Sequence, residues 1–189
     1  MKARRLIAIS VFCCAVSLSV TVVHAREVSG VSMPEVVSVE GRELRLNGMG
    51  VRKQKAFFKV YVIGLYLEKP THDAQAAITT DEAKRIILQM LRDVSREDFV
   101  LALETGMMRN SGPAMPTLRA RLDLLEEALP APKKGNVLDL TYLSGTGTLL
   151  RGQGREIMIP GKDFADTLLS VWLGSKPVSG SLKRELLGG

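Results

Sequence analysis

Cysteine is almost absent from this sequence. The 189 residues hold 2 cysteines, Cys13 and Cys14, and both lie in an apolar stretch over residues 6–23. A short basic segment precedes that stretch, and a small-x-small pattern ending at Ala25 follows it. This order of features is typical of a secretory signal peptide. We therefore expect residues 1–25 to be cleaved off and the protein to be secreted across the inner membrane into a bacterial periplasm.

Loss of that segment narrows what the rest of the chain can do. Residues 26–189 would remain as a single domain of 164 residues with no cysteine, which excludes a disulfide, a thiolate nucleophile and a sulfur metal ligand. Three basic residues and no acidic one would leave, so the net charge falls from +6 to +3. So small a charge does not favour nucleic acid as a partner. We also expect no stable membrane anchor after cleavage.

Histidine and phosphate-binding glycine loops are scarce as well. Beyond residue 25 the only histidine is His72, and a lone histidine without a carboxylate cluster is more often a surface residue than a metal ligand or a base. The Gly-Thr-Gly run at 145–147 lacks the lysine and helix of a phosphate loop. We expect neither a metal nor a cofactor. The lysines at 53, 55 and 59 read as the solvated edge of a hairpin.

The order of elements that is present predicts an α+β fold. Alternating and apolar runs indicate strands, helical spacing and caps indicate helices, and Gly-rich turns separate the last strands. The expected strands are 36–39, 44–46, 51–67 with a turn near 54–55, 85–91, 136–143, 148–151 and 156–159. The expected helices are 71–78, one beginning at Ser95, one beginning at Pro116, 163–174 and 181–187. Strands, helices, strands and helices in that order favour an antiparallel sheet.

Arg52 is the most conspicuous candidate functional residue. Residues 47–52 (NGMGVR) predict a glycine-bracketed turn that presents this arginine beside the apolar run of 57–67. An unpaired charge on an apolar face is costly, so Arg52 must be paired or must bind an anion. Asp93 and Glu104 are its possible internal partners.

Several segments in this order resemble the chalcone isomerase-like family, and the chain looks like its bacterial, exported branch. They are residues 46–52 (LNGMGVR), 59–68 (KVYVIGLYLE), 91–93 (LRD) and the tail from 173 to 184. The resemblance runs from about Gly30 to the end. It implies an open-faced β-sandwich, in which a layer of helices covers one face of a long antiparallel sheet and a ligand cleft lies between them.

The resemblance also implies site residues. In the plant isomerases an arginine after the Gly-x-Gly motif stabilises ring closure electrostatically, and Arg52 matches it, while Tyr61 stands where those enzymes carry a threonine. Another branch binds fatty acids through an arginine and a tyrosine on the next strand, which Arg52 and Tyr61 resemble. Tyr66 would point to the opposite face of a regular strand. The apolar residues expected to line the cleft, each with ordinary core as its alternative, are Val60, Val62, Ile63, Leu103, Met107 and Met108.

Three functions remain open from the sequence. The first is non-catalytic binding of a fatty acid or a similar amphipathic carboxylate, held by Arg52 and Tyr61. The second is an intramolecular lyase or isomerase acting on an enone, with Arg52 stabilising an oxyanion and Tyr61 donating a proton. The third is a structural or partner-binding protein, which predicts a closed core and an Arg52 paired with a carboxylate.

Overall fold

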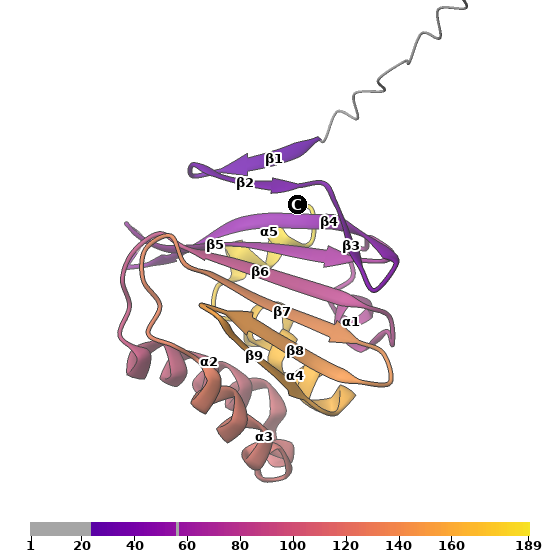
Figure 1. Cartoon of the computed structure of the whole chain (residues 1–189), viewed down its shortest axis with the longest axis vertical. Coiled ribbons are helices and arrows are strands. Elements are labelled where there is room, and N and C mark those ends of the chain that lie inside the picture. Colours follow the sequence, from indigo (N-terminus) through magenta and orange to yellow (C-terminus); the bar gives the residue numbers. More distant parts are fainter. Residues whose placement is uncertain (1–23, 56) are drawn as a thin grey trace, which may run out of the picture.

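One antiparallel sheet forms the centre of the molecule. The structure is a computed structural model, and it describes residues 24–55 and 57–189. Seven strands lie in chain order, each paired with the next, which confirms the expected antiparallel α+β architecture (Figure 1). Except for its last two residues, the expected signal peptide lies outside the described residues. The strands are β3 (Val36–Val39), β4 (Arg42–Gln54), β5 (Phe58–Leu67), β6 (Lys84–Met90), β7 (Val137–Leu143), β8 (Gly147–Gly152) and β9 (Arg155–Ile159).

The helices pack on one side of this sheet, as expected. In Figure 1, α4 and α5 lie behind the strands in yellow, and α2 and α3 lie at the lower edge. No helix among the described residues has the length and apolar character needed to cross a membrane. The helices are α1 (Ala74–Thr79), α2 (Arg96–Ser111), α3 (Met115–Ala128), α4 (Lys162–Leu173) and α5 (Gly180–Leu186), and a short 3-10 turn (Gly112–Ala114) links α2 to α3.

Side-chain caps fix where these helices begin. The Ser95 hydroxyl accepts a hydrogen bond from the Asp98 backbone N–H at 3.1 Å, which confirms the predicted start of α2. Helix α1 begins at Ala74 instead of the expected residue 71. The reason is Asp73, whose carboxylate accepts the N–H groups of Gln75 and Ala76 and so acts as the N-cap.

The main hydrophobic core lies between the sheet and the helices. Its largest fully buried side chains come mainly from β5, β6, α2, α3 and α4, and they include Ile63, Leu88, Met107, Leu122, Phe164 and Trp172. Burial of apolar side chains on this scale is the main stabilising contribution to such a fold. The core therefore fixes the position of the helix layer relative to β4 and β5, the strands that carry Arg52 and Tyr61.

A two-stranded hairpin covers part of the other face of the sheet, and the sequence analysis missed it. It consists of β1 (Ala25–Val28) and β2 (Val31–Pro34), joined by a turn at Ser29 and Gly30 with φ of 53° and 79°. Two successive residues with positive φ are the signature of a type I′ hairpin turn. The hairpin encloses a second, smaller core that contains Tyr66, whose hydroxyl donates to the Pro34 carbonyl at 2.9 Å.

The glycine-bracketed turn predicted at 47–52 is wrong, because these residues lie inside strand β4. The glycines serve a different purpose, which is the close approach of α5. A Cβ on Gly48 would lie 2.2 Å from the carbonyl oxygen of Glu185, and one on Gly50 would lie 2.1 Å from that residue's carboxylate. Only glycine leaves room for the helix here. The strand also has a register shift between Leu46 and Gly48.

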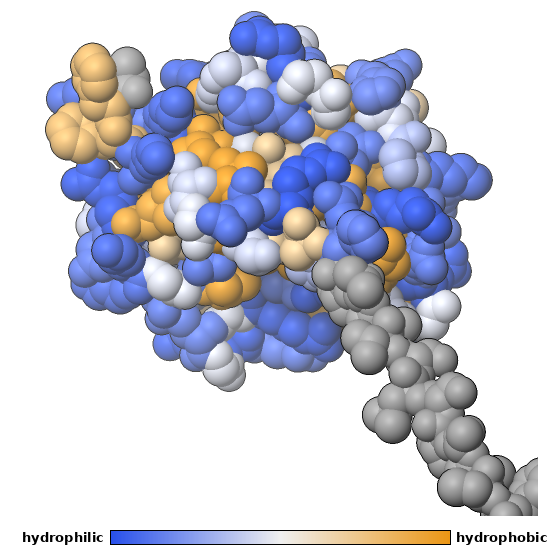
Figure 2. All heavy atoms as spheres, turned by 90° about the horizontal axis from the view of Figure 1, so that it is seen from above, coloured by the Kyte–Doolittle hydropathy of each residue, from blue (hydrophilic) through white to orange (hydrophobic). Residues whose placement is uncertain are grey.

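The surface seen from above is mostly hydrophilic, with hydrophobic patches between the polar side chains (Figure 2). One orange-tinted projection stands clear of the body at the left of that view. Among the exposed large hydrophobic residues the extreme case is Phe57, with 87% of its surface accessible, next to β5. The β4–β5 hairpin thus ends in an aromatic side chain that contacts little of the molecule.

Candidate functional site

Arg52 and Tyr61 lie directly opposite each other on β4 and β5. Opposed residues of an antiparallel pair project on the same side, and here that side faces the helices, because Tyr61 belongs to the main core. Tyr66 lies on the other face, in the core under the β1–β2 hairpin. The expectation that the two tyrosines point to opposite faces is confirmed.

A cleft of about 470 Å³ opens where these two residues meet the helix layer. Volumes of roughly 300–1,000 Å³ are typical of small-molecule sites. The end of the β4–β5 hairpin, the loop after β6, the first half of α2 and the α4–α5 loop all contribute to its walls. The lining residues are Arg52, Gln54, Val60, Tyr61, Arg92, Asp93, Val94, Ser95, Asp98, Phe99, Leu101, Ala102, Thr105 and Val178.

The Tyr61 hydroxyl is held by a tryptophan from the helix layer. The indole Nε1–H of Trp172 in α4 donates to the Tyr61 oxygen at 3.0 Å, and both side chains are buried. Burial raises the pKa of Tyr61, and this effect exceeds the lowering by the Trp172 hydrogen bond and the Arg52 charge. The phenol therefore stays protonated. An indole N–H can only donate, so this bond uses a lone pair of the phenol oxygen and leaves its O–H to donate elsewhere.

The Arg52 guanidinium has no carboxylate partner within the described part of the chain. It donates to the backbone carbonyl of the neighbouring Lys53. The two acids that the sequence analysis considered as partners are engaged elsewhere: Asp93 pairs with Lys133 at 3.3 Å, and Glu104 pairs with Arg119 at 2.5 Å. A half-exposed cation beside a neutral phenol is a suitable site for a carboxylate, because charge-assisted hydrogen bonds from a guanidinium are among the strongest in proteins.

Helix α5 fixes the position of the strand that carries Arg52. The Glu185 carboxylate accepts the backbone N–H of Val51 at 3.1 Å, immediately before the arginine. The absence of a side chain at Gly50 gives that carboxylate room. Sequence reasoning did not identify Glu185. The available signal was the glycine pair in β4, which was interpreted as a turn; a close approach requires glycine equally, but the sequence does not show which segment approaches.

The expected site residues do not all meet at the cleft. Arg52, Val60 and Tyr61 line it together. By contrast, Ile63, Leu103 and Met107 are buried in the main core and are not among its lining residues.

The two further expected lining residues also lie elsewhere. Val62 is in the second core on the opposite face, and Met108 is exposed. The walls of the cleft are thus formed mostly by the start of α2 and the loop before it. Leu103, Met107 and Met108 of this helix were expected from the sequence to line the cleft, but the helix residues that do so are Asp98, Phe99, Leu101, Ala102 and Thr105.

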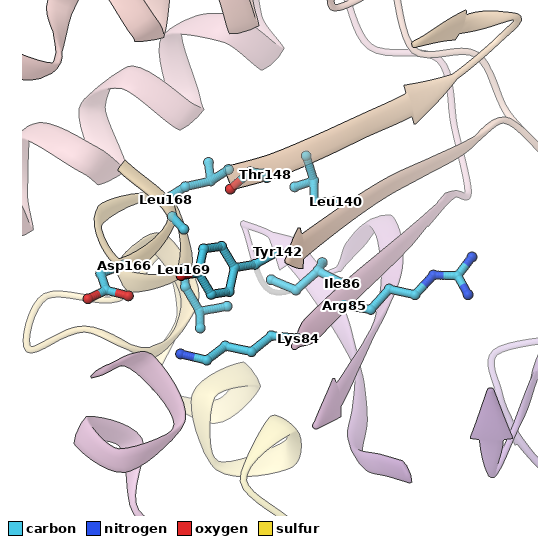
Figure 3. A pocket seen from close by; sticks show the side chains of 10 residues that line it. Lys84, Arg85, Ile86, Leu140, Tyr142, Thr148, Asp166, Leu168 and Leu169 are labelled. Carbon is cyan, nitrogen blue, oxygen red and sulfur yellow. The ribbon is translucent and has the colours of Figure 1, made fainter. Parts of the chain in front are cut away.

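A second, much smaller pocket of about 30 Å³ lies between β6, β7 and α4. Figure 3 shows the Tyr142 ring between Leu169 of α4 and the strand residues Lys84 and Ile86. The Lys84 side chain is buried and its ammonium donates to the Ile78 carbonyl. A space of this size holds little more than a water molecule. The cleft at Arg52 also exceeds the two spaces of about 220 and 240 Å³ beside Pro70 and Glu40, so it is the candidate site for a ligand.

The comparisons with known proteins agree with this architecture. A family model described as chalcone isomerase-like matches residues 25–188. No curated protein sequence matches the chain. Among solved structures, a fatty-acid binding protein from Arabidopsis thaliana superposes with a TM-score of 0.65 at 16% sequence identity, over 87% of this chain and 96% of the other. At that identity the likeness shows the fold.

Proposed function

Since the chain belongs to the chalcone isomerase-like family, we propose that it is a non-catalytic binding protein for a fatty acid or a similar amphipathic carboxylate. The observation that carries the proposal is the pair of donors at the cleft. Arg52 has no carboxylate partner among the described residues, and Tyr61 keeps its O–H available because Trp172 donates to its oxygen. Guanidinium and phenol together match the two oxygens of a carboxylate.

The walls of the cleft suit the apolar part of such a ligand. Val60 and Val178 lie near the donors, and Phe99 and Leu101 come from the first turns of α2. The structural similarity to a protein that binds fatty acids supports the same ligand class. The acyl chain would lie along α2, since Ile63 and other deep core residues are fully buried.

Export to a bacterial periplasm is the second part of the proposal. It is supported by the basic and apolar pattern of the first residues and the small-x-small site ending at Ala25. Cleavage there would leave the Arg26–Glu35 ion pair, with an N–O distance of 3.2 Å, at the new N-terminus. The ligand would then be one that is met outside the inner membrane.

An isomerase acting on an enone is the alternative that the same two donors allow. A cation and a neutral phenol can also stabilise an oxyanion. The raised pKa of Tyr61 makes the phenol a weaker acid and so counts against proton donation. The third possibility, a structural protein, predicted a closed core and a paired Arg52; the cleft and the absence of a carboxylate partner among the described residues disfavour it.

The test is mass spectrometry of protein purified from a periplasmic extract. The measured intact mass should match a chain that begins at Arg26. Organic extracts of the wild type should contain fatty acid. Arg52→Ala should lose most of that lipid, whereas Lys53→Ala, which removes the neighbouring charge, should retain it. Equal lipid in all three proteins would contradict the proposed anchor. A lipid-free wild type that converts an enone substrate would favour the isomerase.

A further inference from the structure

The tip of the β4–β5 hairpin carries two adjacent aromatic residues that are exposed. Phe57 is 87% accessible and Phe58 is 53% accessible. Single exposed apolar residues are common, but neighbouring aromatic rings at a projecting turn are not required by the core. Figure 2 shows the orange-tinted projection at the end of the molecule where this hairpin lies in Figure 1.

Positive charge surrounds these rings with no acidic residue close in sequence. Residues 44–67 include five basic residues and no Asp or Glu, and four of the five fall within 52–59. Lys53 and Lys59 face each other across the two strands. Like charges in opposed positions destabilise a strand pair. Among the described residues neither lysine has an ion-pair partner, so the tip presents positive charge that an external anion would neutralise.

Arg92 extends this basic surface. Its guanidinium lies over the Phe58 ring, 5.4 Å from the centroid. The contact holds the ring beside a cation and occupies one of its faces, which leaves that face unavailable for stacking on a nucleobase. The arrangement is aromatic at the apex and cationic behind it.

We propose that this tip docks on the surface of an anionic lipid bilayer. Exposed phenylalanine rings would enter the boundary between headgroups and acyl chains, and the lysines behind them would meet the lipid phosphates. Lys53 on β4, Lys55 in the turn and Lys59 on β5 flank the two phenylalanines in the sequence. The match between this unneutralised positive tip and a negative membrane surface carries the inference.

The docking tip adjoins the mouth of the cleft. Arg52 and Gln54 on β4 and Val60 on β5 line the cleft, and the next residues toward the turn belong to the tip. Docking would therefore hold the cleft against the membrane. Vesicle binding is measured with no ligand added, so it does not depend on which ligand the cleft binds.

A tryptophan at the tip tests the proposal locally. We would express the full-length Phe57→Trp chain and purify the protein in the form that results from processing in the cell. Vesicles of phosphatidylglycerol and brominated phosphatidylcholine are then added. The native Trp172 is buried and serves as an internal background. The fluorescence emission of the new tryptophan should shift to shorter wavelength, and the bromine atoms should quench it. Leu124→Trp, at an exposed position on α3, is the matched control and should not be quenched.

The charge contribution is tested in the same Phe57→Trp background. A basic residue near an anionic membrane contributes about fivefold to binding, so Lys55→Gln with Lys59→Gln should weaken vesicle binding by about 25-fold. Lys69 lies beyond the far end of β5 and pairs with Glu82, so Lys69→Gln should change binding little. Absence of quenching at position 57, or equal quenching at position 124, would overturn the proposal and leave the tip for a protein or nucleic-acid partner. Equal binding to purely zwitterionic vesicles would overturn the role of charge.

Discussion

At the scale of single residues, Arg52 and Tyr61 are donors of two kinds that lie opposite each other on β4 and β5 and both line the cleft. The arginine is charged and half-exposed, while the tyrosine is neutral and buried. The motif in the sequence indicated the arginine, and alternation along β5 placed Tyr61 and Tyr66 on opposite faces. Trp172, which holds the Tyr61 hydroxyl, lies 111 residues away in the sequence. No local pattern links two residues that meet only when α4 packs on the sheet.

Lys84 shows how burial shapes a residue outside the cleft. Its side chain is enclosed by β6, α1 and α4, and its ammonium lies 5.8 Å from the centre of the Tyr142 ring. Burial lowers the pKa of Lys84 to about 8, against the opposing effect of the Asp166 charge. The folded protein therefore holds this proton less tightly than the unfolded chain does.

This difference predicts a dependence of stability on pH. The pKa of Lys84 is 10.5 in the unfolded chain and about 8 in the folded protein. The free energy of unfolding should consequently rise with pH across that window, because the unfolded state holds more protons. In urea unfolding at pH 7 and pH 10, wild type should gain stability relative to Lys84→Met. Parallel pH profiles for the two proteins would contradict the assignment.

At the scale of elements, most helices and strands followed from the sequence. The strands of the meander and the stripe of Leu118, Leu122 and Leu125 in α3 have the expected periods. The β1–β2 hairpin was missed because its short strands were not separated from the end of the expected signal peptide. The Gly-x-Gly segment was misread as a turn because glycine indicates either positive φ or close approach, and only the packed helix shows which applies.

The close approach of α5 to β4 gives a prediction for Gly48, with Gly180 as the control. Gly48→Ala would place a methyl group against the backbone oxygens of Glu185 and Leu186, which cannot rotate away. We expect a loss of about 1–3 kcal/mol in the free energy of unfolding, as for overpacked cores. Gly180→Ala in α5, where no atom lies within 4 Å, should change stability by less than about 1 kcal/mol, in the stabilising direction.

Urea unfolding of both variants measures this contrast. Because α5 also positions Arg52 through Glu185 and Val51, Gly48→Ala should weaken ligand binding as well as stability. A Gly48→Ala protein as stable as Gly180→Ala would show that α5 does not hold β4 in the way described.

At the scale of the whole molecule, the fold places three features at one end. The cleft, its two donors and the aromatic tip of the β4–β5 hairpin all lie where the sheet meets the start of α2. The family resemblance indicated the sheet, the helix layer and a cleft between them. It did not indicate that Ile63, Leu103 and Met107 belong to the buried core and not to the walls of the cleft. The burial of these residues depends on how all the helices pack on the sheet, which no single segment of the sequence shows.

The central claim is that the cleft recognises a carboxylate through Arg52, and one titration tests it most directly. A fatty acid and the fatty alcohol of the same chain length are titrated into wild type, Arg52→Gln and the neighbouring control Lys53→Gln. Charge-assisted hydrogen bonds contribute about 1.5–3 kcal/mol, so wild type and Lys53→Gln should prefer the acid by roughly 10-fold to 150-fold. Arg52→Gln should bind the two ligands equally. Equal binding of acid and alcohol by wild type, or an acid preference that survives in Arg52→Gln, would contradict the account.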